Sequence, residues 1–362
     1  MQRWYGRAIA FSLSVGLMLA ALSSTALAQY KLAKLTSNVS GQAKNTDALL
    51  VNGWGLVYAP GGPFWVSDNG TGWSTLYDGM GTPQALQVVV PAFNGTSGGT
   101  PTGIVYNGSQ EFNVQGWPAI FLFATLDGTI SGWAPQSNPT QAIVAVNNWA
   151  SGAVYTGLAI TGYSSGNFLF AADTANNKVD VYDGSFNLVT SFTDTTLPPG
   201  FTPFGIRDIN GQVYVSFADS TGGPGGYIDI YTEAGTFVKR LAQGKPLNQP
   251  WGFDIAPQNF GSLSGALLIG NNINFASTIN GFSLKNGQFR GTIKNSAGKP
   301  IVIDQLWGID FGGGAGPSVN GNKNQLFFAA GPNNNANGLF GLIEPVDSDG
   351  DRDRDRDNDR DH

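Results

Sequence analysis

The side chains that could do chemistry in this chain carry oxygen rather than sulfur or imidazole nitrogen. Among its 362 residues there is no Cys, and the only His is His362. Ser-His-Asp triads, Cys nucleophiles and His- or thiolate-ligated zinc are therefore excluded from the folded part. What remains is carboxylate chemistry or a hard, oxygen-ligated metal ion, and calcium is the cofactor that such a site would hold.

Carboxylate and amide side chains recur where apolar strands end, as in FLFAAD and VYVSFAD. Two interpretations are open: they converge on one face to bind calcium or a sugar-like polyol, or each caps its own turn. The candidate metal ligands are Asp68, Asp173, Asp219, Asp254 and Asp310. The other candidates for a ligand-binding face are Asn52, Asn69, Asn248, Asn271 and Asp304.

Three residues depart from the pattern of the surrounding strands. Asp254 in PWGFDI and Asp310 in LWGIDF follow a Trp-Gly pair, and Arg207 occupies the matching strand of another repeat. Alternation along a strand gives both Asp residues the orientation of the Gly, toward a central channel. They could bind a cation there, or pair with Arg207 and water. Pairing is the interpretation we favour.

The elements that must position these residues form an internal repeat of about fifty residues. An aromatic residue or Thr, then Gly, then an apolar strand occurs six times. The six phrases are Trp54-Gly55-Leu56, Thr102-Gly103-Ile104, Thr156-Gly157-Leu158, Phe204-Gly205-Ile206, Trp251-Gly252-Phe253 and Trp307-Gly308-Ile309.

Each phrase is followed by two further apolar strands, and most copies add a fourth. Gly numbers 51, only 12% of residues are charged, and the chain has three Glu, a composition typical of strands and turns. Four antiparallel strands per unit predict an all-β, six-bladed β-propeller over residues 29–346. The last copy lacks a fourth strand, and we predict that residues 30–35 supply it and close the ring. A two-sheet sandwich is the alternative.

The Gly of each phrase has a packing role in this fold. Innermost strands crowd around the axis, where a residue without Cβ allows close backbone approach. The preceding Trp54, Phe204, Trp251 and Trp307 are expected to wedge between blades as apolar plugs. The alternative is a stacking platform for a ligand.

The unit GLAITGYSSGNFLFAADTANNKVDVYDG resembles an NHL-type propeller repeat in its opening Gly, its Ala-Asp strand end and its Lys-Val-Asp-Val-Tyr strand. With NGWGL, PFGI and PWGFDI as blade openings, residues 30–346 also resemble a family of uncharacterised secreted bacterial proteins. This resemblance implies fold and export. NHL-like propellers serve as protein- or RNA-binding platforms, and related rings include calcium-dependent lactonases. Those lactonases use a Glu early in the first blade, whereas Glu111, Glu233 and Glu344 lie elsewhere.

Both ends of the sequence predict segments outside the propeller. Arg3 and Arg7 precede an apolar run over residues 8–22 and small residues up to Ala28, the layout of a secretory signal peptide over residues 1–28. The run is short for an uncleaved anchor. We therefore expect cleavage after Ala28 and a secreted or periplasmic protein. Residues 347–362 hold only Asp, Arg, Ser, Gly, Asn and His, which predicts a disordered tail.

Taken together, the sequence predicts a binding or structural module that acts through one face of the disc. We expect a monomer with a protein or glycan partner, without a membrane contact. No basic patch favours nucleic acid. One alternative is a calcium-dependent hydrolase or lactonase that uses the Asp and Asn residues of that face. Another is carbohydrate binding through exposed Trp73, Trp117, Trp133 or Trp149.

Overall fold

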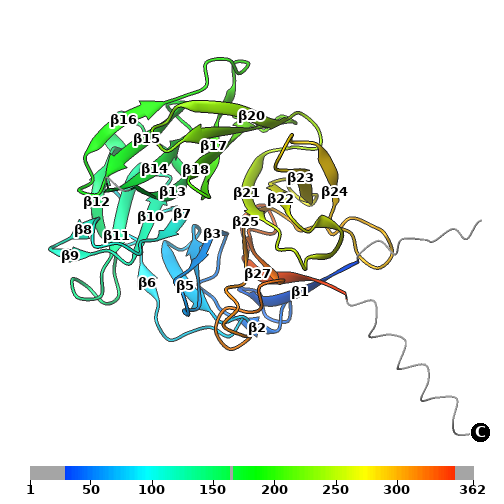
Figure 1. Cartoon of the computed structure of the whole chain (residues 1–362). Coiled ribbons are helices and arrows are strands. Elements are labelled where there is room, and N and C mark those ends of the chain that lie inside the picture. The colour runs from blue at the N-terminus through cyan, green and yellow to red at the C-terminus, as the bar shows by residue number, and fades with distance from the viewer. Residues whose placement is uncertain (1–28, 164–165, 347–362) are drawn as a thin grey trace, which may run out of the picture.

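Six four-stranded antiparallel sheets stand as blades around a central axis (Figure 1). The computed structural model describes residues 29–163 and 166–346, so the predicted signal peptide and the predicted tail lie outside the described residues. Within these ranges, no helix has the length and apolar character needed to cross a bilayer. The predicted six-bladed propeller is confirmed, and the sandwich alternative is wrong.

Each blade runs outward from its innermost strand. Blade 1 comprises β3 (Gly53–Tyr58), β4 (Phe64–Asp68), β5 (Trp73–Tyr77) and β6 (Val88–Val89). Blade 2 comprises β7 (Pro101–Tyr106), β10 (Phe121–Thr125), β11 (Thr129–Trp133) and β12 (Ile143–Asn147). Blade 3 comprises β13 (Tyr155–Tyr163), β14 (Gly166–Asp173), β15 (Lys178–Asp183) and β16 (Leu188–Phe192). Blade 4 comprises β17 (Phe201–Ile209), β18 (Gln212–Asp219), β19 (Tyr227–Thr232) and β20 (Phe237–Gln243). Blade 5 comprises β21 (Pro250–Ile255), β22 (Ala266–Asn271), β23 (Ile279–Ser283) and β24 (Phe289–Thr292).

Blade 6 combines the two ends of the described chain. It comprises β25 (Leu306–Phe311), β26 (Leu326–Ala330), β27 (Leu339–Pro345) and, outermost of the four, β1 (Tyr30–Ser37). Beyond β1 lies the short parallel β2 (Asn45–Thr46). The remaining elements are the hairpin β8 (Asn113–Val114) and β9 (Trp117–Pro118), and the single-turn helices η1 (Trp149–Ser151) and η2 (Gly261–Leu263).

The ring is closed as the sequence predicted, by antiparallel pairing of β1 with β27. Tyr30 lies opposite Pro345 and Leu32 opposite Ile343. The buried Tyr30 hydroxyl donates to the Phe260 carbonyl at 2.7 Å and accepts from the Leu263 N–H at 3.3 Å. Because Phe260 and Leu263 belong to blade 5, this side chain ties the closing strand to the neighbouring blade.

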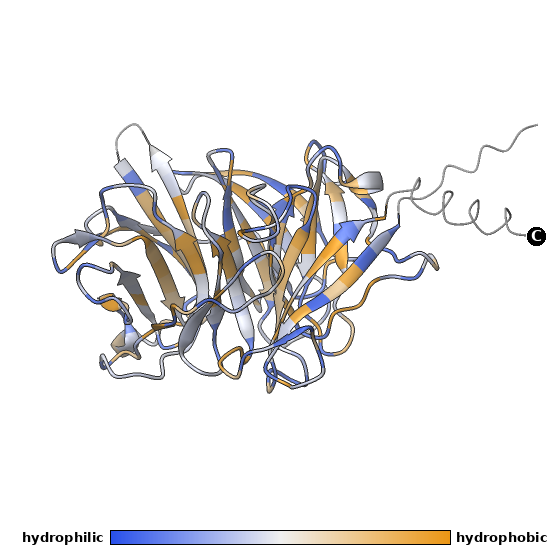
Figure 2. Ribbon diagram, turned by 90° about the horizontal axis from the view of Figure 1, so that it is seen from below, coloured by the Kyte–Doolittle hydropathy of each residue, from blue (hydrophilic) through white to orange (hydrophobic). Residues whose placement is uncertain are grey.

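Apolar side chains fill the space between adjacent blades. Hydrophobic residues lie along the strands, while the loops at both faces are mostly hydrophilic (Figure 2). Between blades 6 and 1, for example, Phe64 packs against Phe327 and Phe340, with ring centroids 4.4 and 5.7 Å apart, and all three rings are fully buried. Burying one such side chain contributes roughly 1.5–3 kcal/mol, so the interfaces between blades hold the ring together.

The repeated Gly residues bring the innermost strands together, as predicted. A Cβ placed on Gly308 would lie 2.7 Å from the carbonyl oxygen of Trp54 in the next blade. A Cβ on Gly205 would overlap the carbonyl oxygen of Trp251. Gly157 is the loosest of these positions, since its nearest neighbours would lie at 3.1 Å. The inner strands therefore touch backbone to backbone around the axis, which only Gly allows.

Candidate functional site

One end of the central channel is closed by aromatic rings. Trp54 and Trp307 stack with ring centroids 3.6 Å apart, and Trp251 meets both edge-on at 6.1 and 5.8 Å. The Trp251 Nε1–H donates across the axis to the Thr156 carbonyl at 2.9 Å. All three Trp residues are at most 8% exposed, so they serve packing rather than ligand stacking. They pack against one another as a plug on the axis, with Phe204 beside them, whereas the prediction placed them between the blades.

Beyond this plug the channel widens into a cavity of about 380 Å³, here called the axial cavity. All six innermost strands line it. Each of these strands is paired on one side only, so its free backbone edge faces the axis. Blades 1 to 3 supply aliphatic side chains together with Tyr58 and Tyr106. The charged groups of the wall, Arg207, Asp208 and Asp310, come from blades 4 and 6.

Arg207 links the inner strands of three blades through ion pairs. One guanidinium nitrogen, Nη2, lies 3.0 Å from Asp310 Oδ1 and 3.5 Å from Asp254 Oδ2, and Nη1 donates to the Ile309 carbonyl at 3.3 Å. Asp254 also accepts from the backbone N–H of Phe311 at 3.0 Å. The favoured interpretation, pairing of both carboxylates with Arg207, is confirmed. Asp310 lies in the cavity wall, whereas Asp254 lies behind it.

Burial perturbs the acid–base chemistry of this wall. Burial raises the pKa of Asp310 to about 7, an effect that Arg207 counteracts and Asp254 reinforces. Burial, followed by the charges of Asp310 and Asp254, raises the pKa of Tyr58 to about 12. Burial also raises the pKa of Asp208, whose Oδ2 is shielded from solvent and has no hydrogen-bond partner among the described residues. The cavity therefore holds more carboxylate than its one guanidinium compensates.

Three of the predicted metal ligands lie apart from this cavity, each at a turn of its own blade. The fully buried Asp68 accepts from the Thr75 N–H at 3.0 Å. Asp173 accepts from the N–H groups of Val154 and Asn176, and Asp219 from the N–H and hydroxyl of Thr221. Among residues 29–163 and 166–346, no three His, Cys, Asp or Glu side chains are grouped to hold a metal. Calcium binding stays a prediction.

The remaining predicted residues connect loops on the face where the connections between blades emerge, here called the connection face. Asn52 donates to Asn69 Oδ1 at 3.1 Å and accepts from Trp307 Nε1 at 3.0 Å. The Asn248 N–H donates to Asn271 Oδ1 at 3.0 Å. The carboxylate oxygens of Asp304 accept from the N–H groups of Phe275 and Asn333. These side chains therefore have local structural partners.

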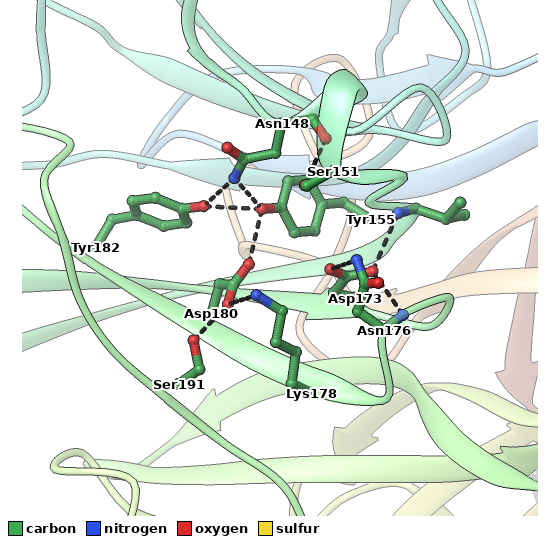
Figure 3. A network of polar contacts seen from close by, with 10 residues as sticks. Asn148, Ser151, Tyr155, Asp173, Asn176, Lys178, Asp180, Tyr182 and Ser191 are labelled. Atoms are coloured by element: carbon green, nitrogen blue, oxygen red, sulfur yellow. Dashed lines mark hydrogen bonds and ion pairs between the residues drawn. The ribbon is translucent and has the colours of Figure 1, made fainter.

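The most regular repeat contains a second polar cluster, and its contacts are structural (Figure 3). Asp180, which is 1% exposed, accepts from the Tyr155 hydroxyl at 2.9 Å and the Ser191 hydroxyl at 2.6 Å, and pairs with Lys178 at 2.8 Å. Asn148, from the connection that precedes blade 3, donates to both Tyr155 and Tyr182 at 2.7 Å. This network joins the strands of blade 3 to the connection from blade 2.

The Trp residues considered for carbohydrate binding do not share one open face. Trp133 is buried and Trp73 is partly buried. Trp117 is 49% exposed in the loop between the first two strands of blade 2, and Trp149 is 54% exposed in the connection between blades. Trp149 stacks flat on Phe93, with ring centroids 4.4 Å apart. The two exposed rings therefore belong to opposite faces of the disc.

Fold and cavity together define a six-bladed β-propeller with a closed ring and an axial cavity. Solved structures with this fold include a luciferin-regenerating enzyme (TM-score 0.53, 12% identity, 82% of this chain and 92% of that one). They also include the gluconolactonase XC5397 from Xanthomonas campestris (0.52, 13%, 82% and 87%) and virginiamycin B lyase from Staphylococcus aureus (0.51, 14%, 88% and 100%). At such low identity these similarities concern the fold alone.

The chain belongs to the same family as the uncharacterized protein R648 of Acanthamoeba polyphaga mimivirus. The two are 30% identical over 344 residues, which cover 88% of this chain and 81% of R648. The uncharacterized mimivirus protein L690 is 30% identical over 305 residues, covering 78% and 79%. No family model matches the chain. These relatives are viral, so the predicted membership of a bacterial family lacks support.

Proposed function

We propose that this protein is a binding module and that its ligand site is the axial cavity. One observation carries the proposal: a space of about 380 Å³ combines hydrocarbon walls with the charged side chains of Arg207 and Asp310. Small-molecule sites typically measure about 300–1,000 Å³ and combine apolar walls with a few polar groups that fix orientation. The aromatic plug adds a rigid floor, which favours a preformed site.

The axial cavity is a better site than the connection face because its polar groups have capacity left. Most candidate side chains of the connection face are occupied by their own turns and loops, as the contacts of Asp173, Asp219 and Asp304 illustrate. In the cavity, the Arg207 side chain is 32% exposed, so its guanidinium is accessible to a ligand. An accessible charged group in an otherwise apolar cavity fixes the orientation of a ligand that bonds to it.

A thermal-shift screen of the mature protein against chemically diverse small molecules tests this site. Ile160 lies in the cavity wall, so Ile160→Trp is expected to fill the space and abolish the shift caused by any hit. Val189→Trp is the matched control, because Val189 is 49% exposed on the outer strand β16. Compounds that raise the melting temperatures of wild type and Ile160→Trp equally would contradict the proposal. A panel in which no compound raises the melting temperature of wild type would also contradict it.

We also propose that the protein acts after export. The arrangement of Arg3, Arg7, the apolar run over residues 8–22 and the small residues up to Ala28 supports this location. Expression of the full-length gene in a secreting host, followed by N-terminal sequencing, tests the proposal. A mature N-terminus at Gln29 is expected, and retention of Met1 in the intracellular fraction would contradict it.

A further inference from the structure

We propose that the ligand of the axial cavity is a small organic cation, a molecule with one or more ammonium groups. Asp310 and Asp208 would meet the charge, and the hydrocarbon part would lie against Tyr58, Tyr106 and the aliphatic wall. This inference rests on the proposed function of the cavity and names the chemical class of its ligand.

The wall of the axial cavity holds more acidic than basic side chains, and this is the first argument for a cationic ligand. Asp310 and Asp208 line the cavity, and Asp254 lies directly behind it, against a single cation, Arg207. Arg207 is already shared between Asp310 and Asp254 through one nitrogen, Nη2. No Lys or second Arg lines the cavity within the described chain. The site is therefore short of positive charge, and a cationic ligand would supply it.

The second step concerns the other carboxylate of the cavity wall, Asp208. Asp208 follows Arg207 on β17, so the two side chains point to opposite sides of the strand. Burial raises the pKa of Asp208 overall, although the Gly211 backbone and the charge of Arg207 both lower it. An ammonium group can donate three hydrogen bonds and carries a full positive charge. The Asp208 carboxylate therefore adds negative charge to the wall, which a bound ammonium group would balance.

The spacing of the carboxylates favours an organic cation over a metal ion. Calcium needs six to eight oxygen ligands at about 2.3–2.6 Å from one point. In the described chain no three acidic side chains are grouped in that way, and Asp208 and Asp310 come from different blades. A molecule that fills part of a 380 Å³ space can reach separated carboxylates through separate ammonium groups.

The part of the wall formed by blades 1 to 3 suits the uncharged part of such a ligand. Tyr58 and Tyr106 come from adjacent blades, and Val57 and Ile160 add aliphatic surface. Aromatic faces attract ammonium groups, and hydrocarbon chains gain free energy when they leave water for an apolar wall. An anion would instead meet an excess of carboxylate.

Isothermal titration calorimetry of the mature protein at pH 7 with four probes tests the ligand class. The probes are 1,4-diaminobutane, tetramethylammonium, glucose and calcium chloride. We expect 1,4-diaminobutane to bind and Asp310→Asn to weaken it at least about tenfold, the loss of one charged contact. Glu233→Gln removes the same charge in the turn after β19, outside the cavity lining, and should leave the affinity unchanged.

Proton release on ligand binding distinguishes direct contact between the ligand and Asp310 from a merely structural role of Asp310. Asp310 faces Tyr58 from β3, Arg207 from β17 and Asp254 from β21, and its pKa of about 7 leaves it partly protonated at neutral pH. A bound cation favours the carboxylate and should release part of a proton. The heats measured in phosphate and in Tris should therefore differ for wild type and agree for Asp310→Asn.

The outcomes separate this inference from the proposed site. Binding of glucose or calcium, lost in Ile160→Trp, without binding of either ammonium compound would overturn the cation and leave the cavity site standing. Binding of 1,4-diaminobutane that Ile160→Trp leaves unchanged would overturn both. Unchanged affinity in Asp310→Asn together with equal heats in both buffers would also overturn the cation.

Discussion

Gly205→Ala is the substitution that tests most sharply how the ring is packed. Gly205 has an ordinary backbone conformation, so only space decides the effect of a side chain there. The new Cβ would overlap the Trp251 carbonyl oxygen and lie 2.9 Å from the Ser216 hydroxyl. That hydroxyl accepts from the Gly205 N–H at 2.8 Å and donates to the Pro250 carbonyl at 2.7 Å, so the Ser216 side chain cannot withdraw freely.

The magnitude follows from the backbone contact. Overpacking of a well-packed core costs typically 1–3 kcal/mol, and we expect about 3 kcal/mol or more because blades 4 and 5 must separate. Gly157→Ala is the matched control, since its Cβ would have its nearest neighbours at 3.1 Å. There the clash is small, and the entropy that Ala removes from the unfolded chain offsets it, so we expect a change within about 1 kcal/mol.

Urea unfolding followed by tryptophan fluorescence and far-UV circular dichroism gives both free energies of unfolding. An equal slope of the free energy of unfolding against urea concentration shows that the two variants expose the same surface on unfolding. Their midpoints can then be compared directly. Equal stability of Gly205→Ala and Gly157→Ala would refute the claim that backbone contact between inner strands sets the blade spacing.

Three further predictions concern single side chains. The Asp310 pKa of about 7 exceeds the ordinary 3.8, so the folded state keeps a proton that the unfolded state loses, and wild-type stability should fall as pH rises from about 4 to 7. The free energy of unfolding of Asp310→Asn, measured relative to wild type in denaturant titrations, should therefore rise across that pH window by on the order of 4 kcal/mol. A difference between the two proteins that stays constant with pH would contradict the raised pKa of Asp310. Tyr30→Phe removes the hydroxyl bound to the Phe260 carbonyl and should cost about 1 kcal/mol in thermal unfolding, whereas a neutral result would mean that this contact does not secure the closing strand. Asp180→Ala leaves the Tyr155 and Ser191 hydroxyls without their acceptor and should cost about 2–4 kcal/mol in urea, and a loss below about 1 kcal/mol would be inconsistent with the buried network.

The propeller could be predicted because its signals are local and repeated. The Gly of each phrase, such as Gly55 or Gly308, marks one inner strand, and residues 30–35 were an unassigned segment before the first copy that could complete the last blade. Strands with weaker signals were missed, among them β24 (Phe289–Thr292) and the hairpin β8–β9. Their sequences are short and rich in polar residues or interrupted by Gly, so pattern alone does not distinguish them from loops.

The candidate site was predicted only in part. Alternation along the strand gave the orientation of Asp310, and its pairing with Arg207 across 103 positions of sequence followed from their matching places in the repeat. Tyr58, Tyr106 and Asp208 were missed as cavity-lining residues. Each lies three positions after the Gly of its blade, as does Ile160, so comparing equivalent positions could have found them. The turn-capping roles of Asp68 and Asp173 depend on hydrogen bonds that a sequence does not display.

A crystal structure of the protein grown with 1,4-diaminobutane tests the central claim most directly. We predict density for the diamine inside the axial cavity, with one ammonium group within hydrogen-bond distance of Asp310 and its chain against Tyr58. Density for the diamine only on the connection face or the outer surface, with water alone in the axial cavity, would contradict the account.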